Sequence, residues 1–257
     1  MAINRASIAK QLLPGLNAVF GVEYGDVNDE HTPLFETENS DRSFEEEVLF
    51  TGFGTAPVKS EGAAVSFDDA QESFTARYNH ETVALAFSIT EEAMEDNLYD
   101  TFAKVRSRAL ARAMANTKQV KAATIFNQGF VAGDTAIGDG QAFFSASHPV
   151  VGGGTQSNLL AAADLAEAAL ETALITIDGT KDGSAHNDIN AIRNMGVIPG
   201  GYFVNRRFTN SNDYFIKTDV PNGTKMFVRV PLQTKMEPDF DTGNVRFKAR
   251  ERYSFGV

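Results

Sequence analysis

Residues 73–89 read SFTARYNHETVALAFSI, and residues 90–127 continue as TEEAMEDNLYDTFAKVRSRALARAMANTKQVKAATIFN. In the first stretch apolar and polar side chains alternate, which is the period of β-strands. From Ser88 onward the apolar side chains recur at helical spacing, and Ser88 and Glu91 have the spacing of a capping box. The change of period predicts strands that lead directly into a long helix.

The helix after this junction is predicted to run from about 98 to 127, roughly 45 Å at 1.5 Å per residue. Asn97 is expected to separate a short first helix from it. Carboxylates come first along this segment and bases follow, which is the order that the helix dipole favours. We interpret so long a helix as a structural spine. Its buried stripe is expected to consist of Leu98, Phe102, Val105, Ala109, Ala113, Val120 and Ala123.

The segments before these strands predict a short helix and a long ribbon. Residues 6–20 have helical apolar spacing, and Pro14 is expected to shorten or break that helix. Residues 21–47 are expected to be extended; within them FETENSDRSFEEE (35–47) holds six carboxylates against one arginine, which is typical of a solvated segment. The glycine-rich residues 48–67, with the strands after them, predict a two-stranded ribbon. Such a ribbon is marginal alone and needs another surface to lie on.

The second half of the chain is loop-rich at 128–158, helical at 162–176 and β-leaning at 201–230. The final stretch, NVRFKARERYSFGV (244–257), has the clearest alternation in the chain. It predicts a long strand with one buried face and one basic face. The buried face comprises Val245, Phe247, Ala249, Tyr253, Phe255 and Val257, and the basic face comprises Arg246, Lys248, Arg250 and Arg252.

Composition narrows the class of protein. The chain has 257 residues, of which 42% are hydrophobic, enough for one large or two modest domains with a core. It contains no cysteine, which excludes disulfides, thiolate catalysis and cysteine-based zinc sites. No run of about 18 apolar residues exists, so no membrane span is expected. The net charge of −11 argues against a general nucleic-acid binder, which would be basic.

The stretch AFFSASHPVVGGGTQSN (142–158) places Ser147 and His148 beside a glycine run. A Ser/His hydrolase is the alternative of another class that this stretch raises. It lacks the flanking glycines of a nucleophile elbow, and adjacent side chains diverge on an extended chain, so we favour a turn. The glycine run lacks the lysine of a phosphate-binding loop. No catalytic, cofactor-binding or metal-binding residues are therefore assigned.

The basic face of the last strand requires an acidic partner. Nucleic acid is one candidate, but the face lacks the interleaved aromatic residues of single-strand platforms. Because the whole chain is acidic, we favour pairing between chains, with the acidic run 35–47 as the complement. The apolar residues of the ribbon are also expected to lie against another subunit. The expected inter-subunit contact residues are Glu36, Glu38, Glu45, Glu46, Glu47, Phe50, Phe53, Pro57, Val58, Lys59, Arg246, Lys248, Arg250 and Arg252.

Several stretches, taken together and in order, resemble the major capsid proteins of tailed bacteriophages, and most nearly the Mu-type prophage major head subunit with the HK97 capsid fold. The resemblance covers most of the chain. It rests on residues 40–100, on DGQAFFSASHP (139–149) with GGTQSNLL (153–160), on DINAIRNMG (188–196), on TDVPNGTKMF (218–227) and on MEPDFDTGNVRFKARERYSFG (236–256).

The resemblance implies an α+β, HK97-like capsid fold with named parts. Residues 1–45 would be the N-terminal arm with its short helix, and 46–80 the E-loop, an extended β-hairpin. Residues 81–150 would form the P domain around the spine helix, 151–235 the A domain, and 236–257 the return strand of the P domain. Relatives carry more chain between the 162–176 helix and residue 187. Either the A domain is trimmed here, or residues near 178–188 and after 257 are absent from the sequence.

The function implied is that of a structural, non-enzymatic head subunit without cofactors. It would assemble into hexamers and pentamers of an icosahedral or prolate shell around phage dsDNA, without sequence-specific DNA binding. An encapsulin-type shell that holds cargo protein is the alternative of the same fold. Expected partners are a separate scaffolding protein, a portal and a decoration protein. The expected location is the virion capsid, after assembly in the cytoplasm of the bacterial host.

Two expectations concern maturation. The first helix begins almost at Met1, so no large cleaved propeptide is expected. Lys59 lies in the ribbon, where related shells join lysines to asparagines of a neighbouring subunit. A lysine at a loop tip usually serves solubility, and no covalent cross-link is expected.

Overall fold

The structure, a computed structural model, divides into two compact units. It describes residues 5–51, 53, 55–68, 72–95, 99–133, 137–151, 153–164, 169–170, 172–173, 176, 203–210, 212–218, 223–239 and 242–257. Unit 1 comprises residues 1–45, 78–123 and 224–255, and unit 2 comprises 46–77, 124–223 and 256–257. The chain thus leaves unit 1 for the ribbon after residue 45 and returns at residue 78.

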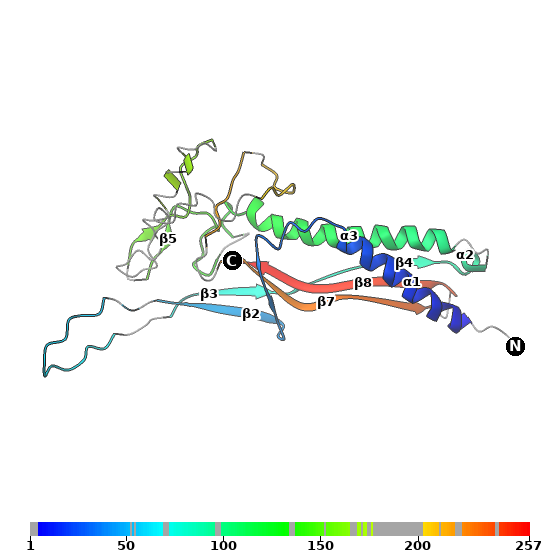
Figure 1. Ribbon diagram of the computed structural model, residues 1–257, viewed down its shortest axis with the longest axis horizontal. Helices are drawn as coiled ribbons and strands as arrows, with labels where there is room; N and C mark the ends of the chain where they lie inside the picture. Colours follow the sequence, from blue (N-terminus) through cyan, green and yellow to red (C-terminus); the bar gives the residue numbers. More distant parts are fainter. Residues whose placement is uncertain are drawn as a thin grey trace. The chain divides into compact units, whose positions relative to one another are not determined.

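Unit 1 is built on a four-stranded sheet in the order β1-β7-β8-β4 (Figure 1). The strands are β1 (Glu36–Asn39), β7 (Lys225–Pro238), β8 (Val245–Gly256) and β4 (Glu81–Ile89). The strand β1 runs parallel to β7, with Glu36 opposite Lys225. The strand β4 runs antiparallel to β8, with Glu81 opposite Tyr253 and Ile89 opposite Val245. The sheet therefore joins segments from the start, the middle and the end of the chain.

The helices α1 (Arg5–Gly25) and α3 (Tyr99–Asn127) pack on one face of this sheet (Figure 1). A short helix, α2 (Glu91–Glu95), precedes α3. The core consists of apolar side chains from both long helices, β4 and β8, including Leu16, Phe20, Leu110, Met114, Phe247 and Ala249. The alternation predicted for β8 is confirmed from Val245 to Arg250, where Val245, Phe247 and Ala249 are buried and Arg246, Lys248 and Arg250 are exposed. Tyr253 is buried as predicted, but Ser254 is buried as well, and Arg252, Phe255 and Val257 are half-buried.

Two local predictions are wrong. The helix α1 continues through Pro14 to Gly25, because burial of Leu16 and Phe20 against the sheet outweighs the local cost of a proline. Ser88 does not cap a helix, because it lies within β4 opposite Arg246. The cap is instead Thr90, whose hydroxyl accepts a hydrogen bond from the Ala93 amide at 3.4 Å.

The buried face of α3 also differs from the predicted stripe. Phe102 and Val105 are 57% and 55% exposed, and Val120 is also exposed. The side chains of this helix that are buried in unit 1 instead include Ala103, Ser107, Leu110, Ala111, Met114 and Ala122, while Ala123 is buried as predicted. Large and small apolar residues occur on both faces of the helix, so its spacing alone did not identify the buried one. The predicted bounds of the helix, about 98 to 127, agree with Tyr99–Asn127.

Unit 2 contains the two-stranded ribbon and a loop-rich body. The ribbon pairs β2 (Phe44–Phe50) with β3 (Glu72–Asn79), and each of these strands begins or ends across the boundary with unit 1. A small hairpin pairs β5 (His148–Pro149) with β6 (Thr155–Gln156). The core of this body is a cluster of six aromatic rings: Phe126, Phe130, Phe143, Phe144, Phe208 and Phe215.

Several expectations fall on other parts of the chain. The region near 178–188, and most of the helix predicted at 162–176, lie outside the described residues. The described residues of 203–218 contain no strand, whereas the strand that begins at Lys225 belongs to the sheet of unit 1. An A domain that ended at residue 235 would divide β7, because this strand continues to Pro238.

Candidate interaction surfaces

The stretch around Ser147 and His148 forms a turn with its own hydrogen bonds. His148 Nδ1 lies 2.7 Å from Asp139 Oδ2, and the hydroxyls of Ser145 and Ser147 lie 3.3 Å apart. His148 Nε2 is buried without a hydrogen-bond partner in the part of the chain that the structure describes. A catalytic histidine needs this nitrogen on the nucleophile, so the geometry is that of a structural turn.

The glycine run next to it closes the hairpin between β5 and β6. Gly153 and Gly154 adopt positive φ angles of 103° and 93°, a region that glycine enters without steric cost. The Val150 amide donates to the Gly154 carbonyl at 3.2 Å, and the Gly153 amide donates to the Val150 carbonyl at 3.0 Å. The turn uses these amides internally, which leaves no phosphate-binding loop.

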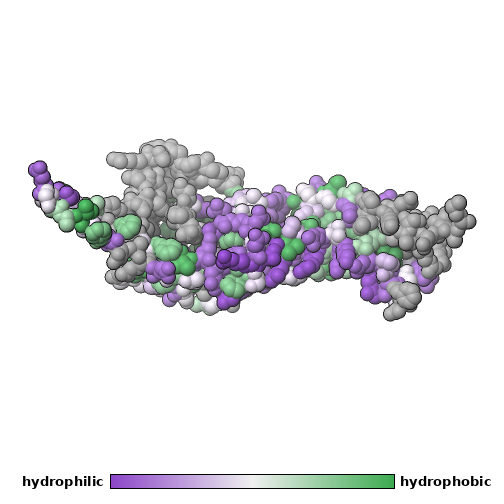
Figure 2. Space-filling view, turned by 90° about the horizontal axis from the view of Figure 1, so that it is seen from below, coloured by the Kyte–Doolittle hydropathy of each residue, from purple (hydrophilic) through white to green (hydrophobic). Residues whose placement is uncertain are grey.

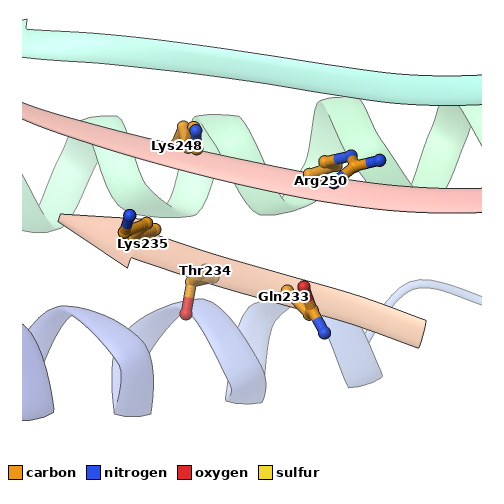
Figure 3. A pocket seen from close by; sticks show the side chains of 5 residues that line it. All are labelled: Gln233, Thr234, Lys235, Lys248 and Arg250. Atoms are coloured by element: carbon orange, nitrogen blue, oxygen red, sulfur yellow. The ribbon is translucent and has the colours of Figure 1, made fainter. Parts of the chain in front are cut away.

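The open face of the sheet in unit 1 carries the basic strip: Arg246, Lys248 and Arg250 of β8 with Lys235 of β7. Lys248 and Arg250 line a groove of about 480 Å³ together with Gln233, Thr234 and Lys235 (Figure 3). Thr234 points toward α1 (Figure 3), where its hydroxyl donates to Asn17 Oδ1 at 2.8 Å. The groove therefore follows the strands on the face that the helices leave uncovered.

Small side chains of β4 lie beside the basic strip, on the edge away from β7. Ala84 and Ala86 of β4 lie opposite Arg250 and Lys248, and both alanines are exposed. Arg246 is paired with Asp239, and Lys235 with Glu237. Hydrophilic residues dominate the centre of the surface seen in Figure 2. The strip can therefore accept a further anionic or acidic partner, mainly at Lys248 and Arg250.

The acidic residues 36–47 lie within the fold more than the sequence predicts. Glu36 and Glu38 are in β1, at the edge of the sheet, and Glu38 contacts Lys225 at 3.3 Å. Phe35 and Ser40, on either side of this strand, are buried. From the sequence, many contacts of residues 30–47 are predicted to lie between chains, with the segment projecting from the body. This prediction is wrong for β1, which completes the sheet. Glu45, Glu46 and Glu47 follow in β2, where Glu46 lies 3.7 Å from Arg77.

The ribbon exposes the apolar residues that the sequence singles out. Phe50, Phe53 and Val58 are exposed, Val58 completely, and Pro57 and Lys59 beside it are exposed as well. The sequence analysis missed Val65 and Phe67, the latter 95% exposed. Both residues belong to the same glycine-rich stretch, 48–67, so the sequence could have predicted their exposure. In Figure 2 the extreme tip of the ribbon, at the left, is hydrophilic, and hydrophobic residues follow directly behind it.

A buried polar cluster joins α1, α3 and β8, and the sequence analysis missed it. Lys118 Nζ lies 2.7 Å from Glu251 Oε2 and donates to the Tyr24 hydroxyl at 2.6 Å. The Tyr24 hydroxyl in turn lies 3.3 Å from the same carboxylate oxygen. Burial, and then the charge of Glu251, raises the pKa values of both Tyr24 and Tyr253, so these phenols stay neutral. The parity of β8 already placed position 251 on the inward face.

Within the described ranges, no helix is both long and apolar enough to cross a bilayer. In the same ranges, no group of three or more His, Cys, Asp or Glu side chains could hold a metal ion. The candidate functional sites of the described residues are two surfaces, the apolar ribbon and the basic strip.

Comparison with known proteins decides the family. The model of the family described as "Phage capsid protein" matches residues 72–257. The chain belongs to the phage capsid protein family. This range includes the helix α3 and the strands β3, β4, β7 and β8, so most of unit 1 lies within the family's own pattern. No curated protein matches this capsid protein.

Solved capsids share its fold. The procapsid protein of bacteriophage JBD30 is 14% identical, with a TM-score of 0.55 over 99% of this chain and 73% of that chain. The JBD30 capsid is 12% identical, with a TM-score of 0.50 over 89% of this chain. The capsid protein described here spans 61% of the length of that JBD30 capsid chain. Its fold is the HK97-like capsid fold, as the resemblance implied.

Proposed function

We propose that this chain is the major capsid subunit of a tailed bacteriophage, a structural and non-enzymatic protein. Copies of it assemble into the hexamers and pentamers of an icosahedral or prolate shell around dsDNA. The observation that carries this proposal is the ribbon, which exposes Phe50 at the end of β2 and Phe53, Val58, Val65 and Phe67 in the segment between β2 and β3. An isolated two-stranded ribbon is marginal in water, and an exposed apolar row marks a contact surface. Family membership is consistent with a second copy as the partner.

The proposed role as a shell subunit predicts which residues lie in the contact between neighbouring subunits. Phe50, Phe53, Pro57, Val58 and Lys59 of the ribbon lie on a neighbouring subunit. Arg246, Lys248, Arg250 and Arg252 meet carboxylates of another copy, for which Glu36, Glu38, Glu45, Glu46 and Glu47 are the nearest candidates in sequence. Within the chain, Glu46 pairs with Arg77, and both side chains are exposed. Such pairs contribute only about 0–1 kcal/mol, so exchanging them between subunits costs little.

Further aspects extend the proposal to the whole particle. The order of the stretches quoted above supports the Mu-type group of head subunits. A separate scaffolding protein directs assembly in the host cytoplasm, and a portal and a decoration protein complete the head in the virion. The shell contacts dsDNA without sequence specificity, because the acidic net charge of −11 opposes tight general binding.

Electron microscopy of the purified full chain, expressed with and without the other head proteins of its phage, tests the proposal. We expect closed shells of uniform size, with nucleic acid rather than a protein cargo inside particles from infected cells. A chain that stays monomeric under every one of these conditions would contradict the proposal. A resident protein cargo would instead favour the encapsulin-type shell. Loss of a measurable hydrolytic activity in Ser147→Ala would show that the non-enzymatic assignment is wrong.

A further inference from the structure

We infer that His80, Ser40 and Ser254 form a clamp that holds both roots of the ribbon, and that protonation of His80 loosens it. The role is separate from the contacts proposed between subunits, and the unassembled chain is sufficient to test it. All three residues lie in unit 1, close to the two points where the chain crosses into the ribbon, after residue 45 and before residue 78.

The clamp rests on three short hydrogen bonds, two of which join segments far apart in sequence. His80 Nε2 lies 2.7 Å from the Ser40 hydroxyl, and His80 Nδ1 lies 3.0 Å from the Ser254 hydroxyl. The Ser40 hydroxyl lies 2.7 Å from Glu45 Oε1. Ser40 and Glu45 flank the start of β2, His80 directly follows β3, and Ser254 belongs to β8. One imidazole thus connects the incoming and the outgoing strand of the ribbon to the sheet.

The direction of the protons follows from the Glu45 carboxylate, which accepts hydrogen bonds only. The Ser40 hydroxyl donates its single proton to Glu45, because charge-assisted bonds are the stronger ones. Ser40 then accepts from His80, so neutral His80 carries its proton on Nε2. His80 Nδ1 is left bare and accepts the proton of Ser254. The four groups form one chain of donors from Ser254 to Glu45.

A second proton on His80 breaks this chain. It would occupy Nδ1, toward which the Ser254 hydroxyl points its own proton, so Ser254 would have to turn away. The surrounding charges also oppose an imidazolium: Arg252 of β8 and Arg229 of β7 repel it, whereas Glu45 of β2 favours it. Burial, and after it these two arginines, lowers the pKa of His80 below its ordinary value of 6.5.

The lowered pKa of His80 determines how the stability of the clamp changes with pH. A base whose pKa is lower in the folded state contributes stability above the pKa of the unfolded state, and this stability falls as the pH drops below 6.5. The clamp is thus closed near neutral pH and weakens in mild acid. Ser40 is only 4% exposed, so its bond to an imidazole does not make it an accessible nucleophile.

The clamp is tested by amide hydrogen exchange in the two strands at the base of the ribbon, residues 44–50 and 72–79. The measured exchange rates are corrected for the intrinsic pH dependence of amide exchange. Between pH 7.5 and 5.5 we expect exchange in the natural chain to rise measurably, because protonation of His80 loosens the clamp. His80→Gln, which keeps a donor for Ser40 but cannot titrate, is expected to show no rise. His148→Gln, a hydrogen-bonded histidine of unit 2, serves as the control and is expected to behave as the natural chain.

A flat profile in the natural chain, or the same rise in His80→Gln, would overturn the inference. Nitrogen-15 NMR of labelled histidines adds an independent readout, in which His80 should be the Nε2–H tautomer at pH 7.5. An Nδ1–H tautomer would overturn the donor order. If His80→Gln does not fold, Ser254→Ala replaces it. Loss of the donor to Nδ1 should raise the pKa of His80 and move the loosening to higher pH, and an unchanged profile would contradict the clamp.

Discussion

At the scale of single residues, the contact between Lys118 and Glu251 matters most for stability in unit 1. The two side chains are only 16% and 2% exposed and come from α3 and β8. Taking two charges out of water is expensive, so a buried pair adds little by itself, but removing one partner leaves an uncompensated charge in the core. Tyr24 of α1 accepts a hydrogen bond from Lys118, which extends the contact to a third element.

We therefore expect Lys118→Ala to lower the free energy of unfolding by about 3–5 kcal/mol. Lys121→Ala is the matched control, because Lys121 pairs with Glu81 near the surface of the same helix and an exposed pair contributes about 0–1 kcal/mol. Urea unfolding of the unassembled chain measures both. Equal losses in the two variants would show that Glu251 is not held in the core by Lys118.

At the scale of elements, the orientation of α3 decides which side of the chain is left for partners. Phe102, Val105 and Val120 are exposed, and the guanidinium of Arg106 lies 5.0 Å from the centre of the Phe102 ring. Leu110 and Met114 of the same helix are in the core. The helix thus presents a second apolar stripe away from its own sheet.

Val105→Ser is expected to change the free energy of unfolding by no more than about 0.5 kcal/mol, as for other exposed positions. Leu110→Ala removes buried methyl groups and should cost about 2–5 kcal/mol. Thermal melting of the two variants, with circular dichroism as the probe, compares them directly. If Val105→Ser destabilised as strongly as Leu110→Ala, the helix would be turned the other way.

Strand β8 was predictable because apolar and polar residues alternate along most of it, interrupted only at Glu251, and the bounds of α3 followed from its period. The face of α3 was not predictable from residue size, because Leu110 and Met114 lie in the core beside small residues, whereas Phe102 is exposed. The segment around β1 was missed because its partner, β7, lies about 190 residues later in the chain and polar residues give no period.

The candidate surfaces were only partly predictable. The exposed residues of the ribbon follow from a glycine-rich stretch that cannot bury them, and Arg246, Lys248 and Arg250 follow from the parity of β8. The clamp around His80 has no signal in the sequence, since it depends on three segments that meet only in the folded sheet. For the acidic run, charge density predicted an extended and solvated segment, and the residues of β1 are indeed exposed. Pairing of its backbone with β7, which places Glu36 and Glu38 at the sheet edge, was not predicted.

At the scale of the whole molecule, an acidic chain has one concentrated basic strip, and the proposed shell uses it between copies. Lys248→Glu should leave the fold intact, because the side chain is exposed beside Ala86, and should raise the protein concentration needed for assembly. Arg206→Glu, an exposed arginine of unit 2, makes the same change of charge elsewhere and should have a smaller effect. Light scattering during assembly distinguishes them, and equal effects would mean that net charge alone is responsible.

The salt dependence of assembly also tests whether the basic strip contacts another subunit. Exposed charge pairs contribute about 0–1 kcal/mol each and are screened over about 8 Å at physiological ionic strength. Moderate salt is therefore expected to weaken assembly of the natural chain without abolishing it, and to have less effect on Lys248→Glu. If salt strengthened assembly of both chains equally, the contact would be apolar and the strip would have no part in it.

Deletion of residues 52–62 tests most directly whether the ribbon acts between subunits. The deletion removes the apolar tip around Pro57 and Val58 and leaves the strands β2 and β3. We predict a monomer with the circular dichroism and melting temperature of the natural chain that no longer forms closed shells in electron micrographs. Normal shells from the shortened chain would contradict the role of the ribbon between subunits, and an unfolded chain would show that the ribbon belongs to the core.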